Sequence, residues 1–101
     1  MRNYDISKSA VQDLIDIWNY SFAVWSEEQA DKYYQKLTNS FESIADANGM
    51  VGRAYDEIYQ GLRACHVGKH LIFFFVRDNN RVLIVRILHE RMDFKRHIRW
   101  R

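Results

Sequence analysis

Two apolar segments, residues 70–76 and 81–88, place the strongest constraint on how this 101-residue chain can fold. Both are rich in β-branched or aromatic residues, and Asp78-Asn79-Asn80 lies between them, so the pattern predicts two antiparallel strands joined by a turn. Successive side chains of a strand point to opposite faces of the sheet, and here both sets are apolar. Because a sheet face in contact with water carries polar residues, the chain or a partner must cover each face.

Two amphipathic segments in the first half of the chain supply a cover for one of these faces. The apolar spacing predicts one helix over 9–24 and a second helix over 26–47. The connection between them is very short, so the two helices are expected to form an antiparallel hairpin. The predicted capping residues are Ser7 or Ser9 for the first helix, and Ser26 and Asn48-Gly49 for the second.

The remaining segments complete a single α+β domain over residues 1–101. Tyr4–Ser7 is a candidate edge strand, 49–61 is typical of an irregular loop, 62–67 is a short strand candidate, and 92–98 is a candidate last helical turn. The predicted order is β-α-α-β-β-β, with the helical hairpin packed on a small antiparallel sheet. The second sheet face is then covered by the C-terminal tail, by another copy of the chain, by a partner, or by the loop 49–61.

Composition and motif spacing exclude several classes of protein. No apolar run approaches the ~20 residues of a membrane helix, and the first ten residues lack a signal-peptide core, so we expect a cytoplasmic protein that does not span a membrane. The single cysteine, Cys65, cannot form an internal disulfide and is expected to pack as a small apolar residue. The four histidines lack metal-ligand spacing, and the glycines match no phosphate-binding loop, so no metal or cofactor is expected.

The charged residues divide unevenly along the chain. Residues 1–50 carry a net charge of −4, whereas residues 51–101 carry +6 and all four histidines. Such asymmetry is typical of a protein that meets an acidic partner or nucleic acid, although a solvated basic edge gives the same count.

Three interpretations of the basic residues near the last predicted strand stay open. In the first, the site cleaves RNA, with His89 or Glu90 as acid or base and with Arg63 and Arg86 holding the phosphate. In the second, the arginines form the rim of a surface for an acidic protein partner. In the third, Arg86 pairs with a nearby carboxylate such as Asp93, and the tail arginines are solvated.

The segment 86–93 (Arg-Ile-Leu-His-Glu-Arg-Met-Asp), preceded by 68–74 (Gly-Lys-His-Leu-Ile-Phe-Phe), resembles the ParE-type toxins of bacterial type II toxin–antitoxin systems. These toxins belong to the RelE/ParE superfamily, and the resemblance extends through the two predicted helices. It implies a compact toxin with an N-terminal strand, a helical hairpin and an antiparallel sheet. It also implies a ParD-like antitoxin that wraps the toxin, and DNA gyrase, specifically its A subunit, as a target that is bound rather than chemically modified.

Two departures from the RelE pattern favour the ParE branch of this superfamily. RelE-like nucleases, which cleave mRNA on the ribosome, carry an arginine soon after the glycine turn, where this chain has Leu71. They also carry a tyrosine or similar group near the C-terminus, whereas no tyrosine follows Tyr59. We therefore expect a toxin that is not an enzyme. The alternatives are a ribosome-dependent RNase using His89, Arg63 and Arg86, and an inactive toxin fold that persists as a partner of its antitoxin.

The basic cluster and the resemblance together define the expected binding residues. The toxin alone is not expected to bind nucleic acid specifically. Residues expected to contact the target are Arg63, Lys69, Arg86, His89, Arg91, Met92 and Asp93. Residues expected to contact the antitoxin are Leu71, Phe73, Phe75, Leu83, Val85 and Ile87, or the residues that alternate with them, because a one-residue shift exchanges the two faces.

Overall fold

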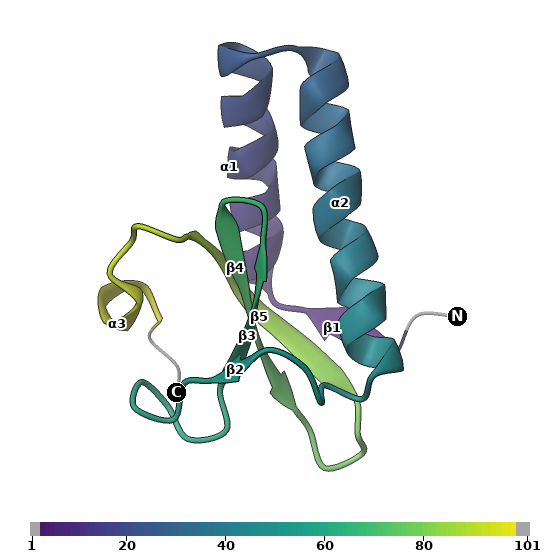
Figure 1. Cartoon of the computed structure of the whole chain (residues 1–101), viewed down its shortest axis with the longest axis vertical. Helices are drawn as coiled ribbons and strands as arrows, with labels where there is room; N and C mark the ends of the chain where they lie inside the picture. Colours follow the sequence, from purple (N-terminus) through teal and green to yellow (C-terminus); the bar gives the residue numbers. More distant parts are fainter. Residues whose placement is uncertain (1–2, 99–101) are drawn as a thin grey trace.

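The computed structural model describes residues 3–98 and contains a helical hairpin packed against a five-stranded sheet (Figure 1). The strands lie in the order β1-β5-β4-β3-β2. Their bounds are Tyr4–Ile6 (β1), Arg53–Ala54 (β2), Arg63–Val67 (β3), His70–Val76 (β4) and Val82–His89 (β5). The predicted α+β class is confirmed, and Arg99 and Arg101 of the predicted basic tail lie outside the described residues.

The sheet differs from the predicted one at both edges. β1 pairs with β5 in a parallel arrangement, so the sheet is antiparallel only from β2 to β5. β2 is a two-residue strand within the segment that was expected to be an irregular loop. The first difference comes from a pairing distant in sequence, Tyr4 with Val82, and the second from the pairing of the exposed strand β2 with β3, and the local apolar pattern encodes neither.

The two helices form as their capping residues predict. α1 spans Lys8–Val24 and α2 spans Glu27–Asp46, each within about two residues of its expected bounds. The Ser7 hydroxyl accepts a hydrogen bond from the Ala10 N–H at 3.0 Å, and the Ser26 hydroxyl accepts one from the Gln29 N–H at 3.1 Å. Each satisfies an N–H group that the first helical turn leaves without an intrahelical partner.

The helical hairpin buries one face of the sheet. Ile72 and Phe74 of β4 and Val82, Ile84 and Ile87 of β5 belong to this helix-side core. The helices contribute Ala10 and Leu14 from α1, and Leu37, Phe41, Ile44 and Ala45 from α2. Tyr4 of β1 packs edge-on against Phe41, with ring centroids 5.6 Å apart, so the short first strand is tied to the same core.

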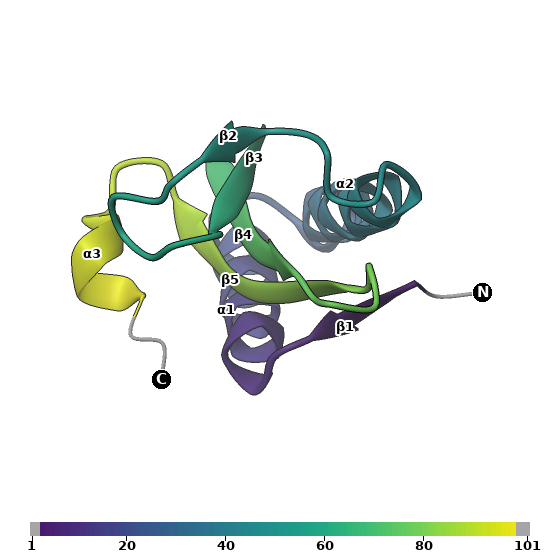
Figure 2. The same ribbon diagram turned by 90° about the horizontal axis from the view of Figure 1, so that it is seen from below.

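The chain itself covers the other face of the sheet. Segment 55–62 and the C-terminal segment 92–98, which contains the short helix α3 (Phe94–His97), lie on the side opposite α2 (Figure 2). They form an outer core with the second set of apolar strand residues. The contacts from these segments come from Tyr55, Ile58, Leu62, Met92, Phe94 and Ile98. Of the four covers considered from the sequence, the loop and the C-terminal tail are therefore the ones present.

A β-bulge decides which side chains belong to which core. Phe73 pairs with Arg86, but Phe74 pairs with Ile84, so Val85 is an extra residue in β5. The extra residue shifts the alternation of all later side chains by one. The prediction that Ile87 shares a face with Leu83 and Val85 is therefore wrong: Ile87 lies in the helix-side core, and Leu88 replaces it in the outer core.

No helix within residues 3–98 combines the length and the apolar character needed to cross a membrane.

Candidate functional site

The seven residues expected to contact the target do not form one cluster. Arg63 lies at the start of β3, opposite Phe74, whereas Lys69 and His89 lie at the other end of the strands. The Arg63 side chain donates hydrogen bonds to the carbonyls of Val51 and Gly52, each at 3.1 Å. This arginine therefore fixes the segment that follows α2.

Arg86 pairs with a carboxylate, as the third interpretation suggested, but the partner is Asp13 of α1, and the suggestion of Asp93 is wrong. The Arg86 Nε and Nη2 atoms donate to the two Asp13 carboxylate oxygens at 2.8 and 2.9 Å. The Ile87 N–H also donates to Asp13 at 2.9 Å, and Arg86 Nη1 donates to the carbonyl of His97. The side-chain hydrogen bonding between Arg86 and Asp13 raises the pKa of the Arg86 guanidinium.

Asp13 reaches Arg86 because α1 begins beside the part of the β5 edge that β1 leaves unpaired. The Ser7 N–H and hydroxyl bond the carbonyls of Ile84 and Val85, so α1 starts beside β5 and brings Asp13 against Arg86. Asp93 instead precedes α3 at its N-cap position, where its side chain forms no capping hydrogen bond.

The basic residues that do gather lie at the end of the sheet where β3 turns into β4. Lys69 is in this turn, and its carbonyl accepts a hydrogen bond from the Glu90 N–H at 2.9 Å. His89 is the last residue of β5, and its Nδ1 accepts a hydrogen bond from the Arg91 N–H at 3.1 Å. We call Lys69, His89 and Arg91 the basic end of the sheet.

An exposed ion pair borders the basic end. His66 Nε2 lies 2.7 Å from Glu90 Oε1, and this contact lowers the pKa of the Glu90 carboxyl. Cys65, the neighbour of His66, packs against the helix-side core, which confirms its predicted role as a packing residue. Burial raises the pKa of its thiol.

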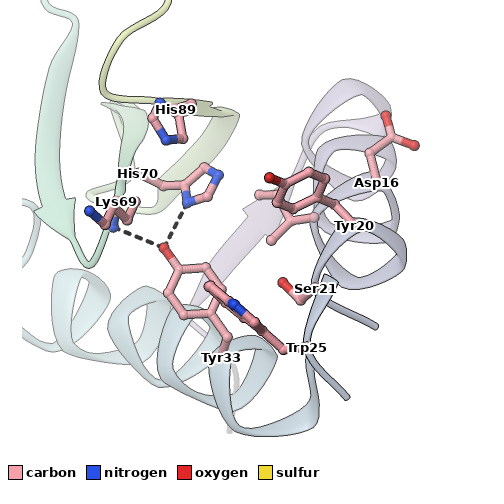
Figure 3. Close-up of a pocket in the computed structure, with 9 residues that line it drawn as sticks. Asp16, Tyr20, Ser21, Trp25, Tyr33, Lys69, His70 and His89 are labelled. Carbon is pink, nitrogen blue, oxygen red and sulfur yellow. Dashed lines mark hydrogen bonds between the residues drawn. The ribbon is translucent and has the colours of Figure 1, made fainter. Parts of the chain in front are cut away.

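A pair of side chains that the sequence did not single out, Tyr33 of α2 and His70 of β4, lies beside the basic end (Figure 3). The Tyr33 hydroxyl is 2.6 Å from His70 Nδ1 and accepts a hydrogen bond from the Lys69 N–H at 3.0 Å. Burial, with a further contribution from His89, lowers the pKa of His70 to about 4, and burial raises the pKa of Tyr33.

The sequence gives only a weak signal that Tyr33 and His70 meet, namely where each one lies in its own segment. His70 directly follows the Gly68-Lys69 turn, and Tyr33 lies on the apolar side of its helix. Gly68 has a φ of +59°, and a Cβ atom there would lie 2.7 Å from the Tyr33 ring. The tyrosine therefore packs directly on the turn, a contact that helical spacing alone does not predict.

The arrangement needed for the proposed RNA-cleaving site is not formed in this structure. Arg63 and His89 lie at opposite ends of the sheet, and Arg86 is bound to Asp13 and His97. Among residues 3–98, no group of three His, Cys, Asp or Glu side chains is placed to hold a metal ion.

The fold and site together define a small two-layer α+β protein with charged and aromatic groups at one end of its sheet. The family of "ParE toxin of type II toxin-antitoxin system, parDE" matches residues 4–94. "Toxin ParE1" of Caulobacter vibrioides is 39% identical over 98 residues, covering 97% of this chain and 99% of the relative. "Toxin ParE1" of Mycobacterium tuberculosis is 36% identical over 95 residues, covering 94% and 96%.

A solved structure supports the same fold. It is titled "Chromosomal ParDE TA system from P. aeruginosa", and one of its chains matches with a TM-score of 0.76 at 22% identity. The match covers 88% of this chain and 96% of that chain. The chain described here belongs to the ParE toxin family of type II toxin–antitoxin systems.

Proposed function

We propose that this chain is a toxin that binds and inhibits DNA gyrase, through the A subunit, and that a ParD-like antitoxin neutralises it in the cytoplasm. The observation that carries this proposal is the family match, which runs from residue 4 to residue 94. The absence of the RelE-type arginine at Leu71 supports binding rather than RNA cleavage as the mode of action.

The basic end of the sheet is the part of the predicted edge that supports contact with gyrase. Lys69 and Arg91 are exposed and carry no ion pair within residues 3–98, so their charges are available to acidic groups of a partner. Met92 packs on the outer core, and Arg63 and Arg86 bind within the chain, so these three hold the shape of the edge.

The antitoxin is proposed to act on the outer face of the sheet. Leu71, Phe73, Leu83 and Val85 are buried there beneath segments 55–62 and 92–98, and Phe75 is half-buried. An antitoxin that contacts them must therefore displace one of these segments. Faster amide hydrogen exchange across either 55–62 or 92–98 in the complex would support this competition, and slower exchange across both segments would contradict it.

Two assays with the purified chain test the proposed target. We expect loss of gyrase supercoiling and unchanged in-vitro translation. Blocked translation with unaffected gyrase would overturn the proposal in favour of an mRNA endonuclease, and no effect in either assay would favour an inactive partner of the antitoxin. Replacing both Lys69 and Arg91 by alanine should weaken gyrase inhibition about tenfold. The matched control, Lys32→Ala with Lys36→Ala on α2, should leave the inhibition unchanged.

A further inference from the structure

A pocket of about 470 Å³ lies between the helical hairpin and the basic end of the sheet (Figure 3). Its volume falls within the roughly 300–1,000 Å³ typical of sites for small molecules. Part of its wall is apolar or aromatic, and part is formed by hydrogen-bond donors. The wall residues used below are Tyr20, Trp25, Tyr33, Lys69, His70 and His89.

The hydrogen bonds behind the pocket determine which nitrogen of His70 carries the proton. The Tyr33 oxygen accepts from the Lys69 N–H, and the Tyr33 proton has a close acceptor in His70 Nδ1 at 2.6 Å, compared with 3.4 Å to the carbonyl of Val67. We assign the Tyr33 proton to the bond with Nδ1, which leaves the proton of the neutral imidazole on Nε2. Burial keeps His70 neutral at physiological pH, since it lowers its pKa to about 4.

Two donors then face one another across the pocket. In Figure 3 the second ring nitrogen of His70 points toward Tyr20, and the Tyr20 hydroxyl points back toward the ring. An acceptor group placed between them can receive both hydrogen bonds. Tyr20 and Trp25 are 66% and 62% exposed, so two large aromatic surfaces beside these donors are left in contact with water.

The charges around the pocket favour a negatively charged acceptor. Lys69 lies in the wall and forms no ion pair within the described part of the chain. Asp16, the carboxylate that the described residues contribute to the wall, accepts a hydrogen bond from Gln12 at 2.9 Å. Figure 3 shows this carboxylate directed away from His70. Glu90 is paired with His66 at 2.7 Å.

We propose that this pocket binds a small planar ring carrying a carboxylate or phosphate group. The ring would pack against the side chains of Tyr20 and Trp25, the anionic group would accept from His70 and Tyr20, and Lys69 would add positive charge nearby. This site goes beyond the proposed gyrase inhibition, because it takes a free small molecule, although it shares Lys69 with the surface proposed to contact gyrase.

Nuclear magnetic resonance of the isotope-labelled chain can test the site with four probes. Indole-3-acetate represents an aromatic carboxylate, and adenosine 5′-monophosphate represents a nucleotide. Indole alone and inorganic phosphate alone test the ring and the anion separately. We expect saturable shifts of the Tyr20, Trp25 and His70 resonances with at least one of the two combined probes, and binding of that probe about tenfold tighter than either part alone.

The two combined probes distinguish the source of the ligand. Preference for indole-3-acetate assigns the site to an aromatic carboxylate, and preference for the nucleotide assigns it to a nucleoside phosphate; both results support the proposal. Saturable shifts with neither combined probe would overturn it. Equal binding of inorganic phosphate alone would also overturn it, since the aromatic wall would then contribute nothing.

Tyr20→Phe is the most informative variant because it removes only one hydroxyl, from an exposed side chain, and we expect the fold to be unchanged. Loss of a hydrogen bond to a charged group should weaken binding about tenfold. Tyr34→Phe, on an exposed tyrosine of α2 outside the pocket, is the matched control and should bind as the unmodified chain does. Equal affinity of the Tyr20→Phe variant and the control would refute the assigned hydrogen bond.

Discussion

Removal of the Asp13 carboxylate should destabilise the protein more than removal of any other acidic side chain considered above. Asp13 and Arg86 are 12% and 24% exposed at their side chains, so water replaces the lost contacts only in part. The Asp13→Ala variant leaves a guanidinium without its carboxylate and the Ile87 N–H without its acceptor. These three hydrogen bonds link α1 to β5.

The expected cost follows from these contacts. A hydrogen bond to a charged group contributes about 1.5–3 kcal/mol, and an unpaired buried N–H costs a further ~1–3 kcal/mol. We take the lower part of each range because Arg86 keeps some access to water, which gives about 3 kcal/mol. For a domain of this size that corresponds to a fall in Tm of roughly 15 °C.

Urea unfolding followed by circular dichroism measures the loss directly. Asp93→Ala is the matched control, because Asp93 is the carboxylate that the sequence suggested as the partner of Arg86, and it should cost less than about 0.5 kcal/mol. A double-mutant cycle with Arg86→Gln should give a coupling energy of at least about 1 kcal/mol. A loss below about 1 kcal/mol for Asp13→Ala, or equal losses for both aspartates, would refute the reasoning.

Three further predictions concern single positions. Gly52→Ala should destabilise the fold by more than about 2 kcal/mol in urea unfolding, because φ is +77° there and the new Cβ would lie 2.2 Å from the Ala64 carbonyl. His70 should stay neutral by NMR titration down to about pH 4. Since its pKa is below the unfolded value of 6.5, its contribution to stability should fall as the pH decreases from about 6.5 toward 4. Cys65 should react with iodoacetamide more slowly than free cysteine at pH 8, because burial raises its thiol pKa.

The sequence predicted most where the signal is local. The N-caps Ser7 and Ser26, and Asn48-Gly49 after α2, place the helix ends within about two residues, because each cap satisfies backbone groups only a few positions away. The sequence also predicted that both faces of the sheet are covered. This follows from the side chains of a single strand, because those that point to either face are apolar.

Contacts between distant residues account for what the sequence did not predict. Arg86 and Asp13 are 73 positions apart, and nothing near Arg86 distinguishes Asp13 from Asp93 as its partner. The bulge at Val85 depends on the register of β4 against β5, so the face of Ile87 could not be read from alternation alone. The pocket joins Tyr33 to Lys69 across 36 positions, and only the packing of α2 on the sheet creates it.

The excess positive charge of the second half is also reduced by pairing within the chain. Arg77 and Arg81 bind Asp5 of β1, Arg86 binds Asp13, and Arg53 binds Glu57. Asp5 and Asp13 come from the acidic first half of the chain. Their ion pairs with arginines of the second half hold β1 and α1 against β5. The cationic surface available to a partner is therefore smaller than the net charge of +6 indicates. Within residues 3–98 it includes the basic end of the sheet, where gyrase and a pocket ligand would both meet Lys69 and would therefore compete.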